Sequence, residues 1–289
     1  PTRDALMRRI EAQYAITPDG TAIIEVAQAC GLMHIEHEQR NPMRTTSYGV
    51  GLLVADALRH NCHKMIIGLG GSATSDAGIG MLRALIDTFA PEDQFNAIRP
   101  LFDNCEVILA SDVTNPLYGI NGAAHVFAKQ KGDTSSMIEA LDVRAKQFAL
   151  HTKRAMGFAK SMQPGAGAAG GLGYAFMQFL NAEMQSGAEL LLHLLQFDKL
   201  LAHADIVITG EGKSDCQTLM GKLPAVIMQH ARQHHLPTLL LSGQIEDRDS
   251  LISAGFKAAC AVTPSDMPLE EAMIPEKAKA NIRDFPLPI

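Results

Sequence analysis

The segment DIVITGEGKSDCQTLMGKLPAVIMQHARQHHLPTLLLSGQIEDRDSLISAGFKAACAVT, residues 205–263, determines the fold class of this chain. Short apolar runs at 205–209, 238–242 and 258–263 predict strands, and helical patterns at 224–235 and around 250–254 separate them. This alternation predicts a parallel sheet with right-handed crossovers. Ligands of such sheets bind beyond the carboxyl ends of the strands, where the loops GEGKSD and SGQIED lie.

The residues upstream of this segment also predict strands followed by helices. Apolar runs predict strands at 21–26, 64–69 and 106–110. Thr45 or Thr46 is expected to cap a helix that runs to about residue 60, and a further helix includes Leu85. The whole chain is therefore expected to be α/β.

One further helix is expected just before the C-terminal segment. Ser186 and Glu189 have the spacing of a capping box, and the leucines at 190, 191, 194 and 195 are expected to face inward. The change in pattern near His203 predicts two domains, residues 1–203 and residues 204–289.

Four glycine-rich segments lie where a predicted strand hands over to a helix: 68–82, 110–132, 164–176 and 207–222. Glycine lets the backbone turn tightly and approach a ligand, and helix N-termini attract anions. Because acids, hydroxyls and lysines accompany these glycines, the four segments together predict a site for a phosphorylated ligand and its metal. The alternative for any one segment is that its glycines only allow close packing at a turn.

Composition excludes several classes of protein. Among 289 residues there are 25 Lys and Arg against 31 Asp and Glu, without a basic block, so nucleic acid is not an expected partner. The longest apolar stretch, AELLLHLLQF, is too short to cross a bilayer, and no secretory signal is visible. Five cysteines without a C-x-x-C pair are typical of a reduced, cytoplasmic protein. HIEH (34–37) and HNCH (60–63) lack the second cluster of a tetrahedral metal site.

Two nucleotide-binding motifs are imitated but not matched. GLGGSA (68–73) partly resembles a dinucleotide fingerprint, but Asp87 does not end a second strand as ribose recognition requires. GEGKS (210–214) resembles a Walker A motif, but Val207 stands where that motif needs its first glycine. An oxidoreductase that binds a dinucleotide through Gly68, Gly70 and Ala73 remains an alternative.

Longer strings carry a specific resemblance. In order along the chain, GGSATSDAG, SDVTNPLYGINGA, QKG, PGAGAAGGLG and DIVITGEGKSDCQT with a following GK resemble the motifs of family 1 (bacterial type) glycerate kinases, from about Glu11 to Ala272. The resemblance implies ATP- and Mg²⁺-dependent phosphorylation of D-glycerate. It also implies a restriction-enzyme-like α/β domain (1–203), part of a flavodoxin-like parallel-sheet domain (204–289), and a site in the cleft between them.

The chain departs from the family pattern at several points. It lacks the family's N-terminal segment with its acidic, glycine-rich motif, and it opens on Pro1, so we expect a truncated chain of poor stability. The link between Ala84 and Cys105 looks shortened, Ser75 replaces Asn, and Lys213-Ser214 replaces Arg-Ile. The alternative function is a catalytically inactive remnant that only binds anions. The oligomeric state and the phosphorylated hydroxyl, 2 or 3, stay open.

The candidate site residues come from the glycine-rich segments. Carboxylates near strand ends suit a base or a metal ligand, and the catalytic candidates are Asp215, Glu211, Asp76 and Asp112. Glu211 and Asp215 are also the candidate Mg²⁺ ligands. Helix capping is the alternative for Asp76, and a local turn contact is the alternative for Asp112. Candidates for binding substrate or phosphate are Gly70, Gly71, Ser72, Thr74, Lys131, Gly170, Gly171, Thr218 and Lys222.

Overall fold

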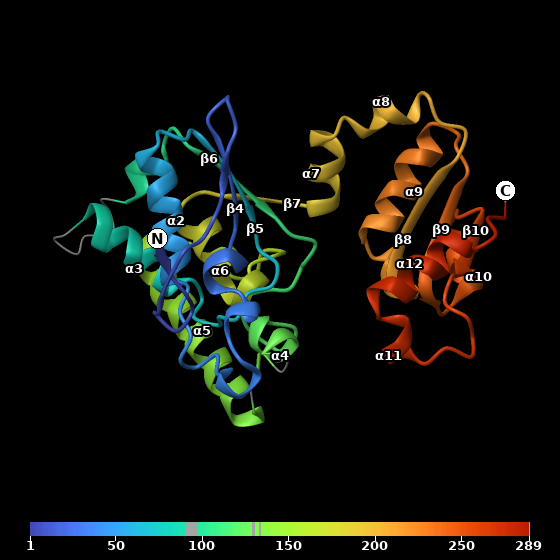
Figure 1. The fold of residues 1–289 in the computed structure, drawn as a ribbon. Coiled ribbons are helices and arrows are strands. Elements are labelled where there is room, and N and C mark those ends of the chain that lie inside the picture. Colours follow the sequence, from blue (N-terminus) through green and yellow to red (C-terminus); the bar gives the residue numbers. More distant parts are fainter. Residues whose placement is uncertain (91–97, 129–130, 133, 289) are drawn as a thin grey trace. The chain divides into compact units, whose positions relative to one another are not determined.

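The computed structural model describes residues 1–90, 98–128, 131–132 and 134–288 (Figure 1). The chain divides into two compact units, Pro1–Gly187 and Ala188–Ile289, each built of strands and helices. The α/β fold class is therefore confirmed. The shortened link expected between Ala84 and Cys105 falls partly on residues 91–97, outside the described residues.

The division between the units precedes the boundary expected near His203, because two short helices pack on the C-terminal unit. These helices are α7 (Gly187–Leu194) and α8 (Phe197–Leu201). Leu192 of α7 clusters with Val226, and Leu201 of α8 clusters with Val207. The restriction-enzyme-like and flavodoxin-like assignments of the two units stay predictions.

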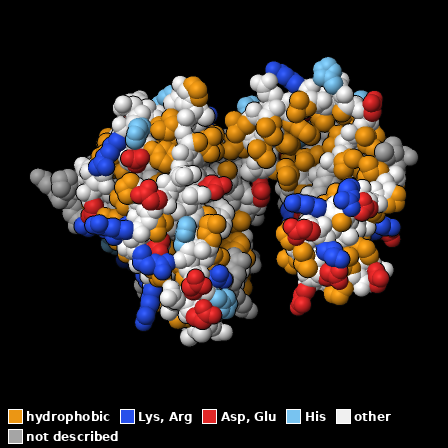
Figure 2. Space-filling model, in the orientation of Figure 1, with side chains coloured by type: hydrophobic (Ala, Val, Ile, Leu, Met, Phe, Trp, Pro, Cys, Tyr) orange, Lys and Arg blue, Asp and Glu red, His pale blue; other side chains and the backbone are white. Residues whose placement is uncertain are grey.

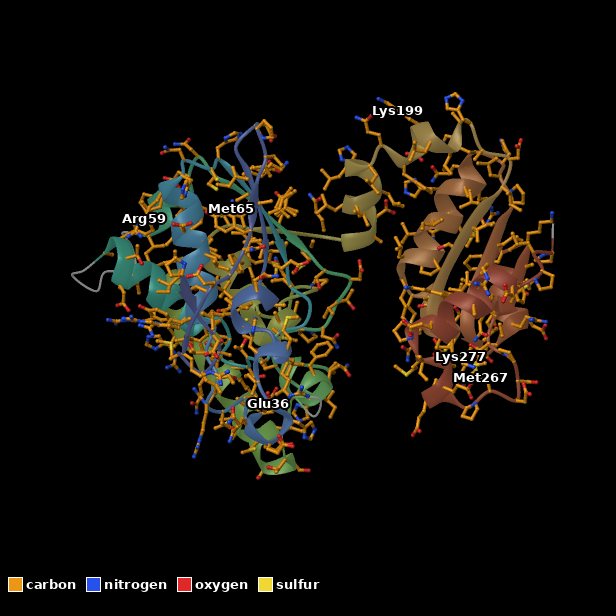
Figure 3. All side chains as sticks on the ribbon, viewed as in Figure 1. Glu36, Arg59, Met65, Lys199, Met267 and Lys277 are labelled. Atoms are coloured by element: carbon orange, nitrogen blue, oxygen red, sulfur yellow. The ribbon has the colours of Figure 1, made fainter. Side chains whose placement is uncertain are left out.

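A five-stranded sheet forms the centre of the N-terminal unit, in the order β3-β4-β5-β6-β7. Strands β4 to β7 are parallel, and β3 is antiparallel to β4. Many side chains of the sheet are apolar and buried, and Met65, labelled in Figure 3, is fully buried. The strands expected at 21–26, 64–69 and 106–110 are confirmed within one residue. The bounds are Ala15–Ile16 (β3), Thr21–Glu25 (β4), Lys64–Gly68 (β5), Glu106–Ala110 (β6) and Glu183–Gln185 (β7).

Helices and a short hairpin complete this unit. Helix α2 begins at Tyr48, so its N-cap is Ser47 and not the expected Thr45 or Thr46. The reason is tertiary, because the carboxylate of Asp76 accepts the N–H of Ser47. The remaining bounds are Thr2–Arg3 (β1), Arg9–Ile10 (β2), Ala27–Cys30 (α1), Tyr48–Arg59 (α2), Ile79–Phe89 (α3), Ala123–Phe127 (α4), Ser135–Met156 (α5) and Ala168–Phe179 (α6).

The C-terminal unit has a three-stranded sheet in the order β10-β9-β8, and both strand pairs are parallel as predicted. Strands β8 and β9 are longer than expected, because the ladder continues through their glycines to the pair Ser214 and Ile245. A Cβ on Gly210 would lie 2.2 Å from the carbonyl oxygen of Leu241. The bounds are Val207–Ser214 (β8), Leu223–Gln233 (α9), Thr238–Ile245 (β9), Arg248–Ala254 (α10), Ala258–Ala261 (β10), Leu269–Ala272 (α11) and Pro275–Asp284 (α12).

The leucines of α7 correct another expectation. Ala188 and Leu192 are the buried residues of this helix, whereas Leu191, Leu194 and Leu195 are about half exposed. Hydrophobic side chains are accordingly visible on the surface in Figure 2. The inward face was predicted wrongly, because contacts with α9 decide which leucines are covered. Within the described parts of the chain, no helix combines the length and the apolar character that crossing a membrane requires.

Candidate functional site

Asp76 joins the N-termini of helices α2 and α3. Its Oδ2 accepts hydrogen bonds from the N–H of Ser47 at 2.8 Å, the hydroxyl of Ser47 at 2.9 Å and the N–H of Gly80 at 3.1 Å. Its Oδ1 accepts from the N–H of Gly78 at 3.1 Å. A carboxylate at a helix N-terminus satisfies otherwise unbonded N–H groups and complements the helix dipole. This geometry supports the capping alternative, and a catalytic role for Asp76 stays a prediction.

Gly170 and Gly171 allow helix α6 to approach the loop that carries Asp76. Both are left-handed, with φ of 66° and 95°, and a Cβ on Gly170 would lie 1.9 Å from the carbonyl oxygen of Thr74. The N–H of Ala77 donates to the carbonyl of Gly170 at 3.0 Å. Ala77 itself has a φ of 55°, and Ala169 has a φ of 52°. Left-handed residues other than glycine store strain, which concentrates at functional sites.

A cavity of about 250 Å³ lies beside this loop, at the carboxyl end of β5. Lys131 lines it and is only 3% exposed, and its ammonium group donates to the carbonyl of Thr74 at 2.6 Å and to the hydroxyl of Ser72 at 3.3 Å. The cavity thus brings together predicted binding residues from three glycine-rich segments. Those that line it are Gly70, Gly71, Ser72, Lys131 and Gly170.

The side chain of Thr74 contacts a buried cysteine, whereas its carbonyl accepts from Lys131. Its hydroxyl lies 4.0 Å from the Sγ of Cys30, and both residues are fully buried. Burial, and then the charge of Asp76, raises the pKa of the Cys30 thiol to about 12. Cys30 is therefore a neutral packing group, and Thr74 contributes its backbone carbonyl to the Lys131 cavity.

Asp112 follows β6 on the exposed surface of the N-terminal unit. Its Oδ1 accepts the hydroxyl of Ser186 at 2.8 Å and the N–H of Gly187 at 2.9 Å. Asp112 is not among the residues that line the Lys131 cavity in the described structure. These contacts place it at the start of α7, and its catalytic role stays a prediction.

In the C-terminal unit, Glu211 is the centre of a network of hydroxyl groups. Its Oε1 accepts the hydroxyl of Thr218 at 2.5 Å and that of Ser214 at 3.0 Å. Ser214 and Ser242 are in turn hydrogen-bonded to each other at 2.5 Å. The ammonium group of Lys222 lies 3.9 Å from Oε2 of Glu211. Glu211, Thr218 and Lys222 thus come together as candidates from one motif, while the roles of Ser214 and Ser242 were missed.

A hydroxyl at the end of a predicted strand, or in the glycine-rich loop after one, is the signal that would have found these two serines. Ser242 ends the run TLLLS, and Ser214 lies within GEGKSD beside Asp215. Both side chains are buried, with 1% and 0% exposure respectively. A buried hydroxyl needs a partner, and the sequence pattern places Ser242 at the end of one predicted strand and Ser214 in the loop that follows another.

Asp215 caps the short 3₁₀ helix Cys216–Leu219. Its Oδ1 accepts from the N–H of Gln217 at 2.8 Å, and its own N–H donates to the hydroxyl of Thr218 at 3.1 Å. This reciprocal pair is a capping box, which fixes the turn after β8. The Thr218 hydroxyl links this box to Glu211, because it accepts the backbone N–H of Asp215 and donates to the Glu211 carboxylate. Binding of metal or substrate by Asp215 stays a prediction.

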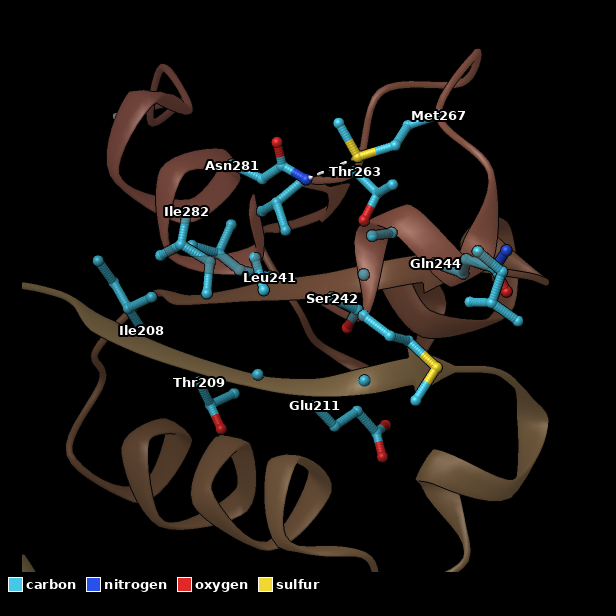
Figure 4. Close-up of a pocket in the computed structure, with 18 residues that line it drawn as sticks. Ile208, Thr209, Glu211, Leu241, Ser242, Gln244, Thr263, Met267, Asn281 and Ile282 are labelled. Carbon is cyan, nitrogen blue, oxygen red and sulfur yellow. Dashed lines mark hydrogen bonds between the residues drawn. The ribbon is translucent and has the colours of Figure 1, made fainter. Parts of the chain in front are cut away.

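A larger cavity of about 580 Å³ lies between the sheet of the C-terminal unit and its last helices (Figure 4). In Figure 4, Thr209 and Glu211 project from β8 to the side opposite Asn281 and Met267. Glu211 is the one ionisable residue among the described lining residues. The rest of the lining is largely apolar, so this cavity offers little charge to a triphosphate.

The dinucleotide alternative finds no support in this geometry. Asp87, the residue nearest to a ribose-binding acid, lies on α3 and pairs with Arg83 at 2.8 Å. It also accepts the hydroxyl of Tyr48 at 2.9 Å. A ribose-binding acid belongs at the end of a second parallel strand, whereas Asp87 lies within helix α3.

Comparisons with known proteins agree on one family. The model of the glycerate kinase family matches residues 1–95 and 91–286. A glycerate kinase from Halalkalibacterium halodurans is 37% identical over 94% of this chain and 78% of its own length. A glycerate 2-kinase from Escherichia coli K12 is 37% identical over 92% of this chain and 75% of its own length. A crystal structure from Salmonella typhimurium LT2 assigned to glycerate kinase 2 superimposes with a TM-score of 0.75, at 34% identity, over 98% of this chain and 78% of that one.

With these likenesses, the fold and the residues at its strand ends define an α/β kinase. The chain belongs to the glycerate kinase family. The resemblance of its glycine-rich motifs to that family is thereby confirmed, and the alternative of an oxidoreductase is set aside.

Proposed function

We propose that this chain transfers the γ-phosphoryl group of ATP to D-glycerate. The proposal is carried by groups near strand ends in a chain whose relatives are glycerate kinases. These groups are a buried lysine in a glycine-lined cavity and a carboxylate that accepts hydrogen bonds from hydroxyls. Phosphoryl transfer requires positioning and charge neutralisation rather than covalent chemistry by the protein. Because the Escherichia coli relative is a glycerate 2-kinase, we propose the 2-hydroxyl as the acceptor.

Glu211 has the geometry best suited to the phosphoryl-transfer site. The hydroxyls of Ser214 and Thr218 fix its Oε1, which leaves Oε2 directed toward the ammonium group of Lys222. By contrast, five donors from the protein already engage the oxygens of Asp76. We assign Glu211 the task of holding the metal or accepting the hydroxyl proton, and Lys222 the task of neutralising phosphate.

The proposed metal is Mg²⁺, and the donor chemistry fits it. Mg²⁺ takes oxygen ligands and is held by one or two carboxylates together with substrate phosphates. The described residues contain no group of three or more His, Cys, Asp or Glu that could hold a metal. Glu211 and Asp215 are the carboxylates that would hold it, and the Thr218 hydroxyl connects the Glu211 carboxylate to the backbone N–H of Asp215. When bound, Mg²⁺ neutralises the charge of the transferring phosphoryl group.

In the proposed reaction, an oxygen of glycerate forms a bond to the γ-phosphorus, and the bond from that phosphorus to ADP breaks. The hydroxyl proton passes to a carboxylate, for which Glu211 is the candidate, or to the phosphoryl oxygens. ADP leaves with the electron pair of the broken bond, so ATP and glycerate become ADP and phosphoglycerate. The test is phosphorus NMR of the product formed from ATP, Mg²⁺ and D-glycerate.

The expected product is 2-phosphoglycerate, formed together with ADP in equal amounts. Formation of 3-phosphoglycerate would keep the kinase and correct the acceptor hydroxyl. A chain that binds glycerate but forms neither product would contradict the proposal and favour the inactive, anion-binding alternative. The shared cleft between two domains, which the family resemblance implies, stays a prediction.

A further inference from the structure

We propose that the cavity around Lys131 binds the carboxylate end of a short hydroxy acid, with the Lys131 ammonium group selecting an acid over an alcohol. The inference rests on the proposed function, because it assigns one end of D-glycerate to this cavity. It also assigns different roles to the two candidate lysines: Lys131 binds the carboxylate of the acceptor, and Lys222 binds the phosphates.

The charge of the cavity is the first argument. Among the lining residues that the structure describes, Lys131 is the one ionisable side chain. Lys131 is 3% exposed, and its ammonium group donates to the carbonyl of Thr74 and to the hydroxyl of Ser72. A buried charge in a small cavity attracts an anion strongly, because little water screens the interaction. Lys131 is therefore oriented before any ligand arrives.

The size of the cavity is the second argument. Its volume of about 250 Å³ lies below the roughly 300–1,000 Å³ of sites for drug-sized ligands, a class that includes nucleotides. It is nevertheless several times the ~30 Å³ that one water occupies in the liquid. Leu32, Val113 and Phe127 contribute apolar walls. This combination suits a few carbon atoms attached to one carboxylate.

The backbone of the cavity is the third argument. Gly70 and Gly71 follow the last residue of β5, at the strand end where parallel sheets bind ligands. A Cβ placed on Gly70 would meet no atom within 4 Å, and its φ lies outside the left-handed range. The absence of a side chain at this position is therefore not required by packing or by conformation. It leaves space beside Lys131 for a ligand.

The experiment is isothermal titration calorimetry of the full chain in the absence of ATP. D-glycerate is the ligand in one titration and glycerol in another. Glycerol has the same carbon skeleton but lacks the carboxylate. We expect the chain to bind glycerate and not glycerol, and Lys131→Met to weaken glycerate binding at least about tenfold. Lys64→Met is the matched control, because Lys64 lies at the opposite end of β5 and pairs with Glu106 at 3.0 Å on the surface.

A second variant keeps the test decisive if Lys131→Met fails to fold. Gly70→Val places a side chain in the open space of the cavity without changing any charge. We expect it to abolish glycerate binding while the thermal unfolding temperature stays near that of the wild-type chain. Unchanged glycerate affinity in Gly70→Val, or no glycerate binding by the folded wild-type chain, overturns the inference.

Titration with inorganic phosphate separates the two anion chemistries. If Lys131→Met loses phosphate affinity and keeps glycerate affinity, the cavity binds phosphate and the inference is wrong. The outcome for the proposed function is distinct. If the chain binds glycerate through Lys131 but releases no ADP, this binding site is supported and the proposed kinase activity is contradicted. If both variants phosphorylate glycerate with an unchanged KM, the kinase activity is supported and this binding site is overturned.

Discussion

The carboxylate of Asp76 accepts both the backbone N–H and the hydroxyl of Ser47, at 2.8 and 2.9 Å, across 29 positions of sequence. The same oxygen also accepts the N–H of Gly80 in the first turn of α3. One side chain thus holds the starts of two helices that pack together in the N-terminal unit. Asp76, one of the four catalytic candidates of the sequence, thus has contacts that support the capping alternative.

We therefore expect Asp76→Ala to destabilise the chain by about 2 kcal/mol or more, since hydrogen bonds to a charged group contribute ~1.5–3 kcal/mol and several donors lose their acceptor. Urea unfolding followed by circular dichroism measures this loss. Asp112→Ala is the matched control, because Asp112 is exposed and we expect a much smaller effect. A stable but inactive Asp76→Ala would show that the side chain acts in catalysis instead.

Gly170→Ala tests the close approach of α6 to the Asp76 loop. The new Cβ would lie 1.9 Å from the carbonyl oxygen of Thr74, so backbone must move. Gly157→Ala is the control, because Gly157 is also left-handed but has no atom within 4 Å of its Cβ. Left-handed strain alone costs ~1–2 kcal/mol. Thermal unfolding should show a clearly larger loss for Gly170→Ala, and equal losses would contradict the packing argument.

His230 of α9 gives the C-terminal unit a pH-dependent stability. Its two ring nitrogens lie 2.9 Å from Asp198 and 3.0 Å from Glu189, and the hydrogen bond to Asp198 is the main cause that raises the pKa of His230. Because the folded pKa exceeds the unfolded value of about 6.5, this stabilisation is complete below that pH. It is lost as pH rises through the raised folded pKa.

Thermal unfolding between pH 6 and pH 9 measures this effect. We expect the unfolding temperature of the wild-type chain to fall over that range more steeply than that of His230→Gln. His193→Gln is the control, since His193 is an exposed histidine of α7. If the unfolding temperatures of the wild-type chain and of His230→Gln change equally with pH, His230 does not cause the pH dependence.

Cysteine reactivity tests the burial of the core of the N-terminal unit, which contains Cys30 and Cys105. Cys216 is exposed, while Cys30 and Cys105 are buried and burial raises their thiol pKa values to about 12 and about 11. At pH 8 a maleimide reagent should therefore label Cys216 within minutes, and it should label the two buried thiols only after unfolding. Peptide mass mapping measures the order of labelling. Early labelling of Cys30 would contradict the packing around Thr74.

The strands were the most predictable part of the fold, and local pattern explains why. The run EVILA gave β6 with its observed bounds, because a strand buried on both faces has an uninterrupted apolar sequence. The length of β8 was not predictable, since its glycines extend the ladder only because β9 lies beside them. The face of α7 was predicted wrongly for a similar reason, because its partner α9 is distant in sequence.

In the candidate site too, the residue types were predictable from the sequence, whereas their contacts were not. The types of residue in the glycine-rich motifs pointed to Glu211, Thr218 and Lys131 before any contact was known. The contact of Lys131 with Ser72, across 59 positions, is a property of the folded chain. The network from Glu211 through Ser214 to Ser242 likewise needs the register of β8 against β9.

The most direct test of the central claim is glycerate-dependent release of ADP from ATP in the presence of Mg²⁺, measured for the wild-type chain and for Glu211→Gln. We predict release that requires D-glycerate, and a fall in kcat of about 10²-fold or more in Glu211→Gln with glycerate affinity retained. Equal rates of ADP release with and without glycerate, or full turnover by Glu211→Gln, would contradict the account.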